Sequence, residues 1–174
     1  GTHVAGTIGA ATDNNAGIAG VSWGSPIVPV RVLGKCGGTL ADIADGIVWA
    51  AGGTVAGAPT NPNPAKVINM SLGGTGPCPA TYRSAIATAQ SLGAIVVVSA
   101  GNSRAGTGGA RPANCPGVIA VTATGQRGER AAYSNFGSPA IISAPGGDNT
   151  VDVMVLSTLN TGSQAPVADT FAFY

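Results

Sequence analysis

The chain has 174 residues, a formal net charge of +1 and only 9% charged residues, with its lysines and arginines scattered along the sequence. This distribution excludes an extended basic surface for nucleic acid, which needs clustered cations to neutralise phosphates. The longest strongly apolar stretch, residues 94–100, is much shorter than the roughly 20 residues of a membrane-spanning helix. We therefore expect neither a nucleic acid nor a membrane as a partner.

Taken in chain order, strand-like and helix-like segments alternate. The patterns predict strands at 26–33, 66–71, 94–100, 117–124 and 140–146, helices at 41–53 and 81–93, and a surface loop at 54–65. Continuous apolar strands separated by helices favour an α/β fold with a parallel sheet covered on both faces. Active sites in such sheets lie beyond the carboxyl ends of the strands, where this chain has MSLGG (70–74) and SAGNS (99–103).

Several short stretches together resemble one enzyme family. These are GTHVAGT (1–7), VINMSLGG (67–74), VVVSAGNS (96–103) and SAPG (143–146), with further matches in VRVLGKCGG (30–38) and AYSNFG (132–137). In this order and spacing they resemble the subtilisin-like serine proteases, and among these the secreted bacterial enzymes with extra disulfides. The resemblance implies a three-layer subtilisin-like fold with a mostly parallel central sheet flanked by helices. It covers Gly1 to about Leu159 and implies one partial peptidase domain over residues 1–174, incomplete at both ends.

His3 is the only histidine of the chain, but it does not match the family's general base. In the family motif H-G-T-H-V-A-G the first histidine is the base, so this residue would precede Gly1. His3 matches the second histidine, an early helix residue that is hydrogen-bonded beneath the active site. The family's nucleophile motif G-T-S-M-A-x-P would follow residues 170–174, and its aspartate would lie upstream of Gly1. We therefore expect all three triad residues outside this chain, and no proteolysis by the chain alone.

Other residues of catalytic type do not fit the family's motifs. Ser163 lies in TGSQAPVAD (161–169), which lacks the threonine before the serine and has its proline one residue early, so we expect a loop serine. The aspartates lie in no matching context and are expected to be solvated: Asp13, Asp42, Asp45, Asp148, Asp152 and Asp169.

Asn102 matches the family's oxyanion asparagine, whose amide donates to the negative charge that develops on the carbonyl oxygen during acyl transfer. Gly101 would let backbone and substrate approach closely. The alternative interpretation is an asparagine that caps the following turn.

The resemblance also implies how a peptide is held. One cleft edge would add a strand of peptide backbone through Ser71, Leu72, Gly73 and Gly74. The opposite edge would consist of Gly37, Gly38 and Thr39. The pocket for the side chain before the cut bond would lie between residues 71–74 and Ala100–Gly101. Its far wall would be near residues 110–112, where Arg111–Pro112 aligns with a cis bond. The alternative for 71–74 is a glycine-rich strand end without a ligand.

Three cysteines, Cys36, Cys78 and Cys115, allow three single bridges. The family layout favours a bridge between Cys78 and Cys115, which leaves Cys36 to pair outside the chain.

The loop at 11–20 matches a place where relatives bind structural calcium, and Asp13, Asn14 and Asn15 have suitable oxygens. Because further ligands would come from outside the chain, we expect a surface turn here, with calcium as an option for the full-length protein. No cofactor is implied for catalysis.

Three interpretations remain open at this point. The first is a part of a secreted, monomeric serine endopeptidase that hydrolyses polypeptides, with a propeptide or a protein inhibitor as further partners. The second is a catalytically dead subtilisin-like domain that binds peptides. An unrelated doubly wound domain with chance motif matches is the third, remote alternative.

Overall fold

The computed structural model describes residues 1–148, 150 and 153–174, so the expectation for Asp152 lies outside the described residues. The elements are α1 Thr2–Gly9, α2 Leu40–Ala50, β1 Val67–Met70, β2 Gly74–Thr75, α3 Ala80–Ser91, β3 Ile95–Ser99, the 3-10 turn η1 Thr107–Gly109, β4 Ala110–Arg111, β5 Val118–Thr124, β6 Ile142–Pro145, β7 Leu156–Asn160 and β8 Asp169–Phe173.

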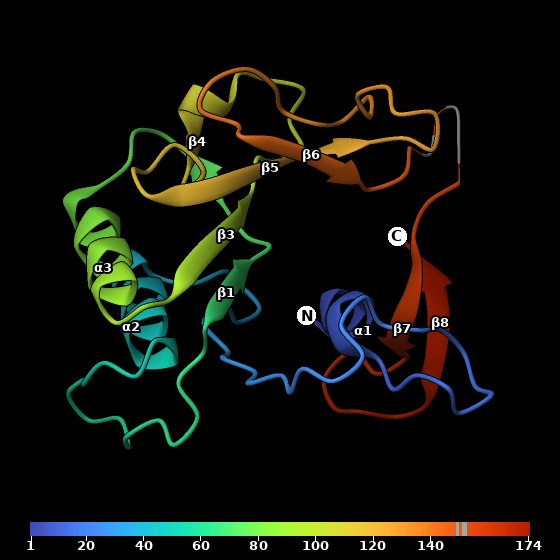
Figure 1. Cartoon of the computed structure of the whole chain (residues 1–174), viewed down its shortest axis with the longest axis horizontal. Helices are drawn as coiled ribbons and strands as arrows, with labels where there is room; N and C mark the ends of the chain where they lie inside the picture. The colour runs from blue at the N-terminus through green and yellow to red at the C-terminus, as the bar shows by residue number, and fades with distance from the viewer. Residues whose placement is uncertain (149, 151–152) are drawn as a thin grey trace.

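A parallel four-stranded sheet in the order β1-β3-β5-β6 forms the centre of the fold (Figure 1). The strands predicted at 66–71, 94–100, 117–124 and 140–146 are all present, each slightly shorter than predicted. Valine and isoleucine dominate β1 and β3, as expected for strands whose branched side chains pack on a pleated surface. The mostly parallel sheet with helices agrees with the subtilisin-like fold class.

Helix α2 has a capping residue at its start, and both α2 and α3 end at glycines. Thr39 accepts a hydrogen bond from the N–H of Asp42 at 3.1 Å and so satisfies one free donor at the start of α2. Beyond the end of α2, Gly52 adopts φ +93° and its N–H bonds to Trp49 O, while Gly53 N–H bonds to Val48 O. This glycine-based C-terminal motif ends the predicted helix. Gly93 ends α3 in the same way, with φ +85°.

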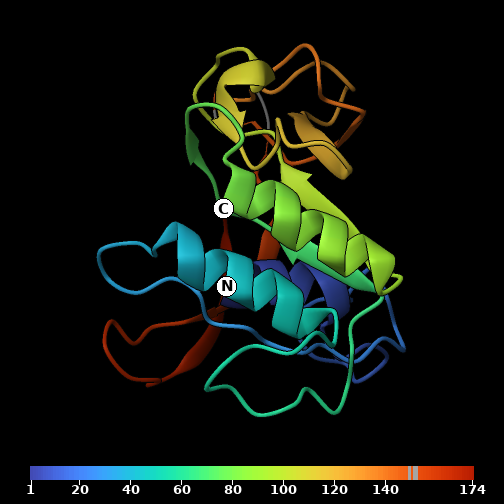
Figure 2. The ribbon, with the colours of Figure 1, turned by 90° about the vertical axis from the view of Figure 1, so that its left-hand side faces the viewer.

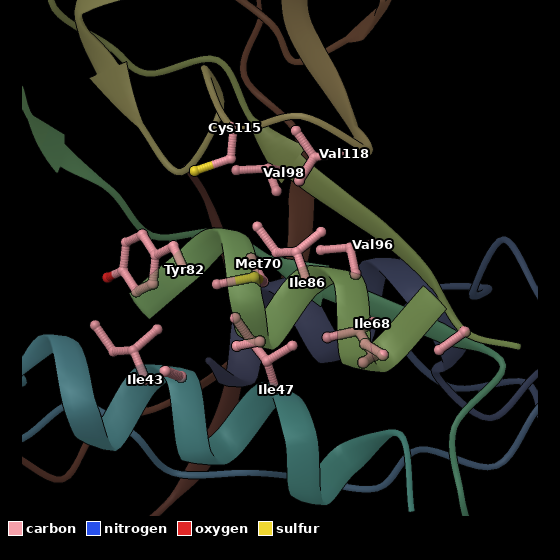
Figure 3. Close-up of a cluster of buried hydrophobic side chains, with 14 of the residues drawn as sticks. Ile43, Ile47, Ile68, Met70, Tyr82, Ile86, Val96, Val98, Cys115 and Val118 are labelled. Atoms are coloured by element: carbon pink, nitrogen blue, oxygen red, sulfur yellow. The ribbon is translucent and has the colours of Figure 1, made fainter. Parts of the chain in front are cut away.

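The core lies between one face of the sheet and the helix pair α2–α3. Figure 2 shows the two helices side by side, and Figure 3 shows apolar side chains of both helices meeting those of β1, β3 and β5. Ile86 of α3 and Val96 of β3 have no exposed surface at all. On the opposite face of the sheet Val67 and Ile95 are 58% and 52% exposed. Among the described helices, α2 and α3 therefore cover a single face of β1 and β3, whereas the sequence favoured cover on both faces.

Helix α1 packs against β7 of the antiparallel β7–β8 pair, apart from the α2–α3 layer (Figure 1). The hydroxyl of Ser157 donates to His3 O at 2.7 Å, and that of Thr158 donates to Thr2 O at 2.9 Å. A side chain at Gly6 would collide with both hydroxyls, so glycine is what allows the close approach of helix and strand.

The predicted strand at 26–33 is wrong. The segment has no strand partner in the described residues, and Ile27 and Leu33 are 41% and 42% exposed. Pro26 and Pro29 lack the N–H that a sheet ladder needs, which confines prolines to strand edges. Val32 still packs against the core. The segment therefore lies along α2 without pairing with a strand of the sheet.

Candidate functional site

A cavity of about 400 Å³ opens at the carboxyl ends of β1 and β3. This is the position at which open parallel sheets bind their ligands. It contains two of the predicted segments, 71–74 and 100–102. The lining residues are Ser71, Leu72, Gly73, Gly74, Thr75, Ser99, Ala100, Gly101, Asn102, Ser103, Ala105, Gly106, Gly109, Ala110, Arg111 and Asn135.

Asn102 follows β3 directly and is exposed to the cavity. Its side chain makes no hydrogen bond to another residue in the described part of the chain, so it does not cap the following turn there. The amide N–H groups are therefore available to a ligand in the cavity.

Gly101 has φ +105°, a conformation that side chains rarely adopt. A Cβ at this position would lie 2.5 Å from Nδ2 of Asn135. Glycine is thus needed both for the backbone turn and for the close packing of Asn135 beneath the loop.

The far wall of the cavity is a short antiparallel ladder. β2 pairs with β4 in the register Gly74↔Arg111, and the N–H of Gly76 extends the ladder to Gly109 O at 2.9 Å. The Arg111–Pro112 bond is cis, as the family resemblance implies. Arg111 carries the one charged side chain among the lining residues, so the wall is otherwise neutral.

A disulfide between Cys78 and Cys115 ties the segment after β2 to the segment after β4. This is the pairing that the family layout favours among the three alternatives. Cys36 is exposed and unpaired within the described residues.

The structure does not bring the second predicted edge into this cavity. Gly37 and Gly38 line a different cavity of about 490 Å³, between the segment 30–34 and α2. Gly37 (φ +94°) forms a tight turn with Gly34, and Thr39 caps α2. These residues therefore lie at the start of α2, and their role as a second cleft edge stays a prediction.

Asn135 lines the cavity and is only 3% exposed, although no role was assigned to it from the sequence. It lies in AYSNFG (132–137), one of the stretches that carry the family resemblance. A polar residue in that matched stretch was the available signal. What the sequence did not reveal is its contact with the loop after β3.

The prediction that Asp148 is solvated is wrong, because it is only 2% exposed. Its carboxylate accepts from the hydroxyl of Thr150 at 2.7 Å and from the N–H groups of Ala132 and Thr150. These hydrogen bonds lower the pKa of Asp148, and the bond from the Thr150 hydroxyl has the largest effect. Beside it, burial raises the pKa of Tyr133, and the negative charge of Asp148 adds to that effect.

The remaining aspartates in the described residues are exposed, as predicted: Asp13, Asp42, Asp45 and Asp169. Ser163 lies exposed in the loop between β7 and β8, which confirms a loop serine.

His3 lies on α1 and does not line the cavity. Its Nε2 is 3.1 Å from both Val155 O and Ala172 O. Because both partners are acceptors, the ring proton belongs on Nε2. The predicted helical, hydrogen-bonded histidine is confirmed.

The loop at 11–20 is a surface turn in which Asn14 Oδ1 accepts from Ala16 N–H, while Asp13 and Asn15 adopt positive φ. No group of three or more His, Cys, Asp or Glu side chains suited to a metal occurs in the described residues. Asp13 and its asparagines alone do not provide the six to eight oxygens that calcium takes. None of the described helices has the length and apolar character needed to cross a bilayer.

Comparison with known proteins identifies the family. A model of the subtilase family matches residues 1–173. The chain is 56% identical to the extracellular protease of Xanthomonas campestris pv. campestris, over all of this chain and 29% of that protein. It is 45% identical to the extracellular basic protease of Dichelobacter nodosus, over 98% of this chain and 27% of that protein.

Among solved structures, one described as proteases from Pseudoalteromonas arctica PAMC 21717 matches with a TM-score of 0.95 and 51% identity, over 99% of this chain and 52% of that chain. The chain thus spans less than a third of the length of these two curated relatives. It belongs to the subtilase family of peptidases.

Proposed function

We propose that the chain is part of a secreted serine endopeptidase and supplies its oxyanion donor and substrate cleft as a single partial peptidase domain. The Ser, His and Asp of the triad lie outside residues 1–174 in this proposal, so the chain alone has no proteolytic activity. In the whole enzyme the serine attacks the peptide carbonyl, the histidine takes its proton, and the aspartate orients the histidine. The extracellular proteases among the relatives and the disulfide support secretion.

The observation that carries the proposal is the position of Asn102. Its unpaired amide projects from the end of β3 into the cavity that Ser71–Gly74 also line. A donor held there by a rigid strand would meet the negative charge of a tetrahedral intermediate, and a preorganised donor of this kind contributes about 3 to 4 kcal/mol.

Substrate binding in this proposal uses the backbone of the segment after β1. No hydrogen bond joins Leu72 to another described residue, so its N–H and C=O are available to pair with an added peptide strand. The substrate is a polypeptide, and the side chain before the cut bond enters the cavity between residues 71–74 and 100–101. A propeptide or protein inhibitor would bind the same edge. We expect a monomer, and structural calcium is an option for the full-length protein, with further ligands from outside this chain.

The first test is to sequence the gene outward from both ends of the coding segment. A histidine codon before Gly1, an aspartate motif further upstream and G-T-S-M-A after Tyr174 are expected. Replacement of the histidine or the serine would contradict an active enzyme and leave a catalytically dead domain that binds peptides through residues 71–74.

The second test is kinetic and uses the full-length protein with a chromogenic peptide substrate. Asn102→Ala is expected to lower kcat by about 100- to 1,000-fold with little change in KM, because the donor acts on the transition state. The matched control is Asn63→Ala, an exposed asparagine remote from the cavity lining. An unchanged kcat in Asn102→Ala would refute the oxyanion assignment.

A further inference from the structure

The side chain of one buried residue, Asn135, bonds several backbone groups of the loop after β3. Its Nδ2 donates to Ala100 O at 2.9 Å. Its Oδ1 accepts from the N–H groups of Ser103 at 2.9 Å and Ala105 at 3.0 Å. One amide therefore satisfies three backbone groups of a loop that has no regular secondary structure to satisfy them.

These bonds lie on both sides of Asn102. The residue before it, Gly101, has its carbonyl bonded by the backbone N–H of Asn135 at 2.9 Å. The residue after it, Ser103, has its N–H bonded by the Asn135 side chain. Both peptide groups that flank the Cα of Asn102 are thus positioned by the same residue, while Asn102 itself stays exposed.

Asn135 is in turn held to the central sheet. The hydroxyl of Ser134 donates to Asn135 O at 2.9 Å and accepts from the N–H of Ala123 on β5 at 2.9 Å. Arg130 Nη1 donates to Ser134 O at 2.8 Å. A continuous series of hydrogen bonds therefore connects β5 to the loop that carries Asn102, through the almost fully buried Ser134 and Asn135.

We propose that Asn135 is a positioning residue that orients Asn102 toward the oxyanion. This inference rests on the proposed function, because it gives Asn102 the role of oxyanion donor. Removing the Asn135 side chain leaves the Ser103 and Ala105 N–H groups without their acceptor, so the loop relaxes and the Asn102 amide moves from its preorganised position. Displacements of about 1 Å at such a site lower rates by up to about 100-fold.

The effect should appear in kcat. An oxyanion donor acts on charge that exists only in the transition state, so its misplacement leaves ground-state binding almost unchanged. We expect Asn135→Ala to lower kcat by about 10- to 100-fold, less than complete removal of the donor, with KM within about twofold of the wild type.

A double-mutant cycle in the full-length protein separates positioning from general stability. Saturation kinetics are measured for the wild type, Asn102→Ala, Asn135→Ala and the double variant, together with the thermal midpoint of each. If Asn135 acts through Asn102, the Asn135→Ala change lowers kcat by less than about twofold once Asn102 is alanine.

The matched control is Asn61→Ala, since Asn61 is 4% exposed and also bonds backbone groups, namely Trp49 O and Ala50 O, but does not line the cavity. We expect it to lower the thermal midpoint without lowering kcat.

An equal loss of kcat on replacing Asn135 in both backgrounds would overturn the inference and leave a purely structural asparagine. If Asn102→Ala alone leaves kcat unchanged, the proposed function fails instead, so the two failures are distinguishable. Should Asn135→Ala not fold, Asn135→Asp takes its place in the same cycle. It keeps an acceptor for Ser103 and Ala105 but places an oxygen against Ala100 O, where the wild type has a donor.

Discussion

The Cys78–Cys115 bridge should contribute strongly to stability, and removing it gives the sharpest test of the fold. The bridge spans 37 residues of sequence, and the chain-entropy relation for a loop of that length gives about 4 kcal/mol at 25 °C. The loop that it closes contains α3, β3 and the segment that carries Asn102. The perturbation is the double change Cys78→Ala and Cys115→Ala in the full-length protein.

The assay is urea unfolding followed by far-ultraviolet circular dichroism, with the wild type measured both oxidised and reduced. We expect the double variant to lose about 4 kcal/mol of stability, and the reduced wild type to lose at least as much, because reduction also opens any bridge that Cys36 makes outside this chain. Ser163→Ala is the control, since this serine is exposed in the loop between β7 and β8, and a change within about 0.5 kcal/mol is expected. A loss below about 1 kcal/mol in the double variant would refute the loop-closure reasoning.

Further predictions concern single sites. Gly101→Ala places a Cβ 2.5 Å from Asn135 Nδ2 at φ +105°, so we expect a loss of about 1 to 3 kcal/mol by thermal unfolding and a lower kcat; an unaltered kcat would count against tight packing at this loop. The pKa of Asp148 is lowered in the fold, chiefly by the Thr150 hydroxyl, so its contribution to stability is present above about pH 4 and is lost as the pH falls through the folded-state pKa. Asp148→Asn should lower the urea midpoint at pH 7 and flatten its decline in acid, and an unchanged slope below pH 5 would contradict this assignment. Ile86 has no exposed surface, so Ile86→Ala should cost about 2 to 5 kcal/mol and Ile86→Val about 1 kcal/mol in urea unfolding; equal costs would argue against a tightly packed site.

Local sequence signals were sufficient for the α2–α3 layer and the central strands. The two glycines after α2 and Gly93 after α3 end their helices by backbone geometry that does not depend on distant contacts. The apolar runs of β1, β3 and β5 predicted the parallel sheet, although they favoured cover on both faces and the helices α2 and α3 cover one face of β1 and β3. Where local chemistry determines the element, the sequence is a reliable guide.

The segment at 26–33 shows the limit of this reasoning. Its valines and isoleucine have the composition of a strand, but a strand also needs a hydrogen-bonded neighbour, and no composition specifies one. The antiparallel pair β7–β8 escaped prediction for the opposite reason. β7 (LSTLN) mixes serine, threonine and asparagine with leucine, and β8 (DTFAF) begins with two polar residues, so neither sequence alternates clearly between apolar and polar residues.

The residues of the candidate site also divide into those that local sequence places and those that depend on distant contacts. Asn102 and residues 71–74 could be placed because strand ends and family motifs fix them locally. For Gly37 and Gly38 the sequence predicted a second cleft edge but not their local structure, a turn between Gly34 and Gly37 just before α2. The contact between Asn135 and the loop after β3 joins residues more than 30 positions apart in the sequence. The buried carboxylate of Asp148 is bonded by Ala132, which is 16 positions away. No local pattern reports such pairings.

The uncovered face of β1 and β3 has a practical consequence for purification. Val67 and Ile95 lie exposed on neighbouring strands in register, and β1 is the edge of its sheet. An exposed apolar face beside an edge strand promotes association between molecules, and a net charge of only +1 provides little electrostatic repulsion against it. We therefore expect the isolated 174-residue chain to precipitate most readily near neutral pH and to become more soluble in mild acid, where protonated carboxylates raise its positive charge.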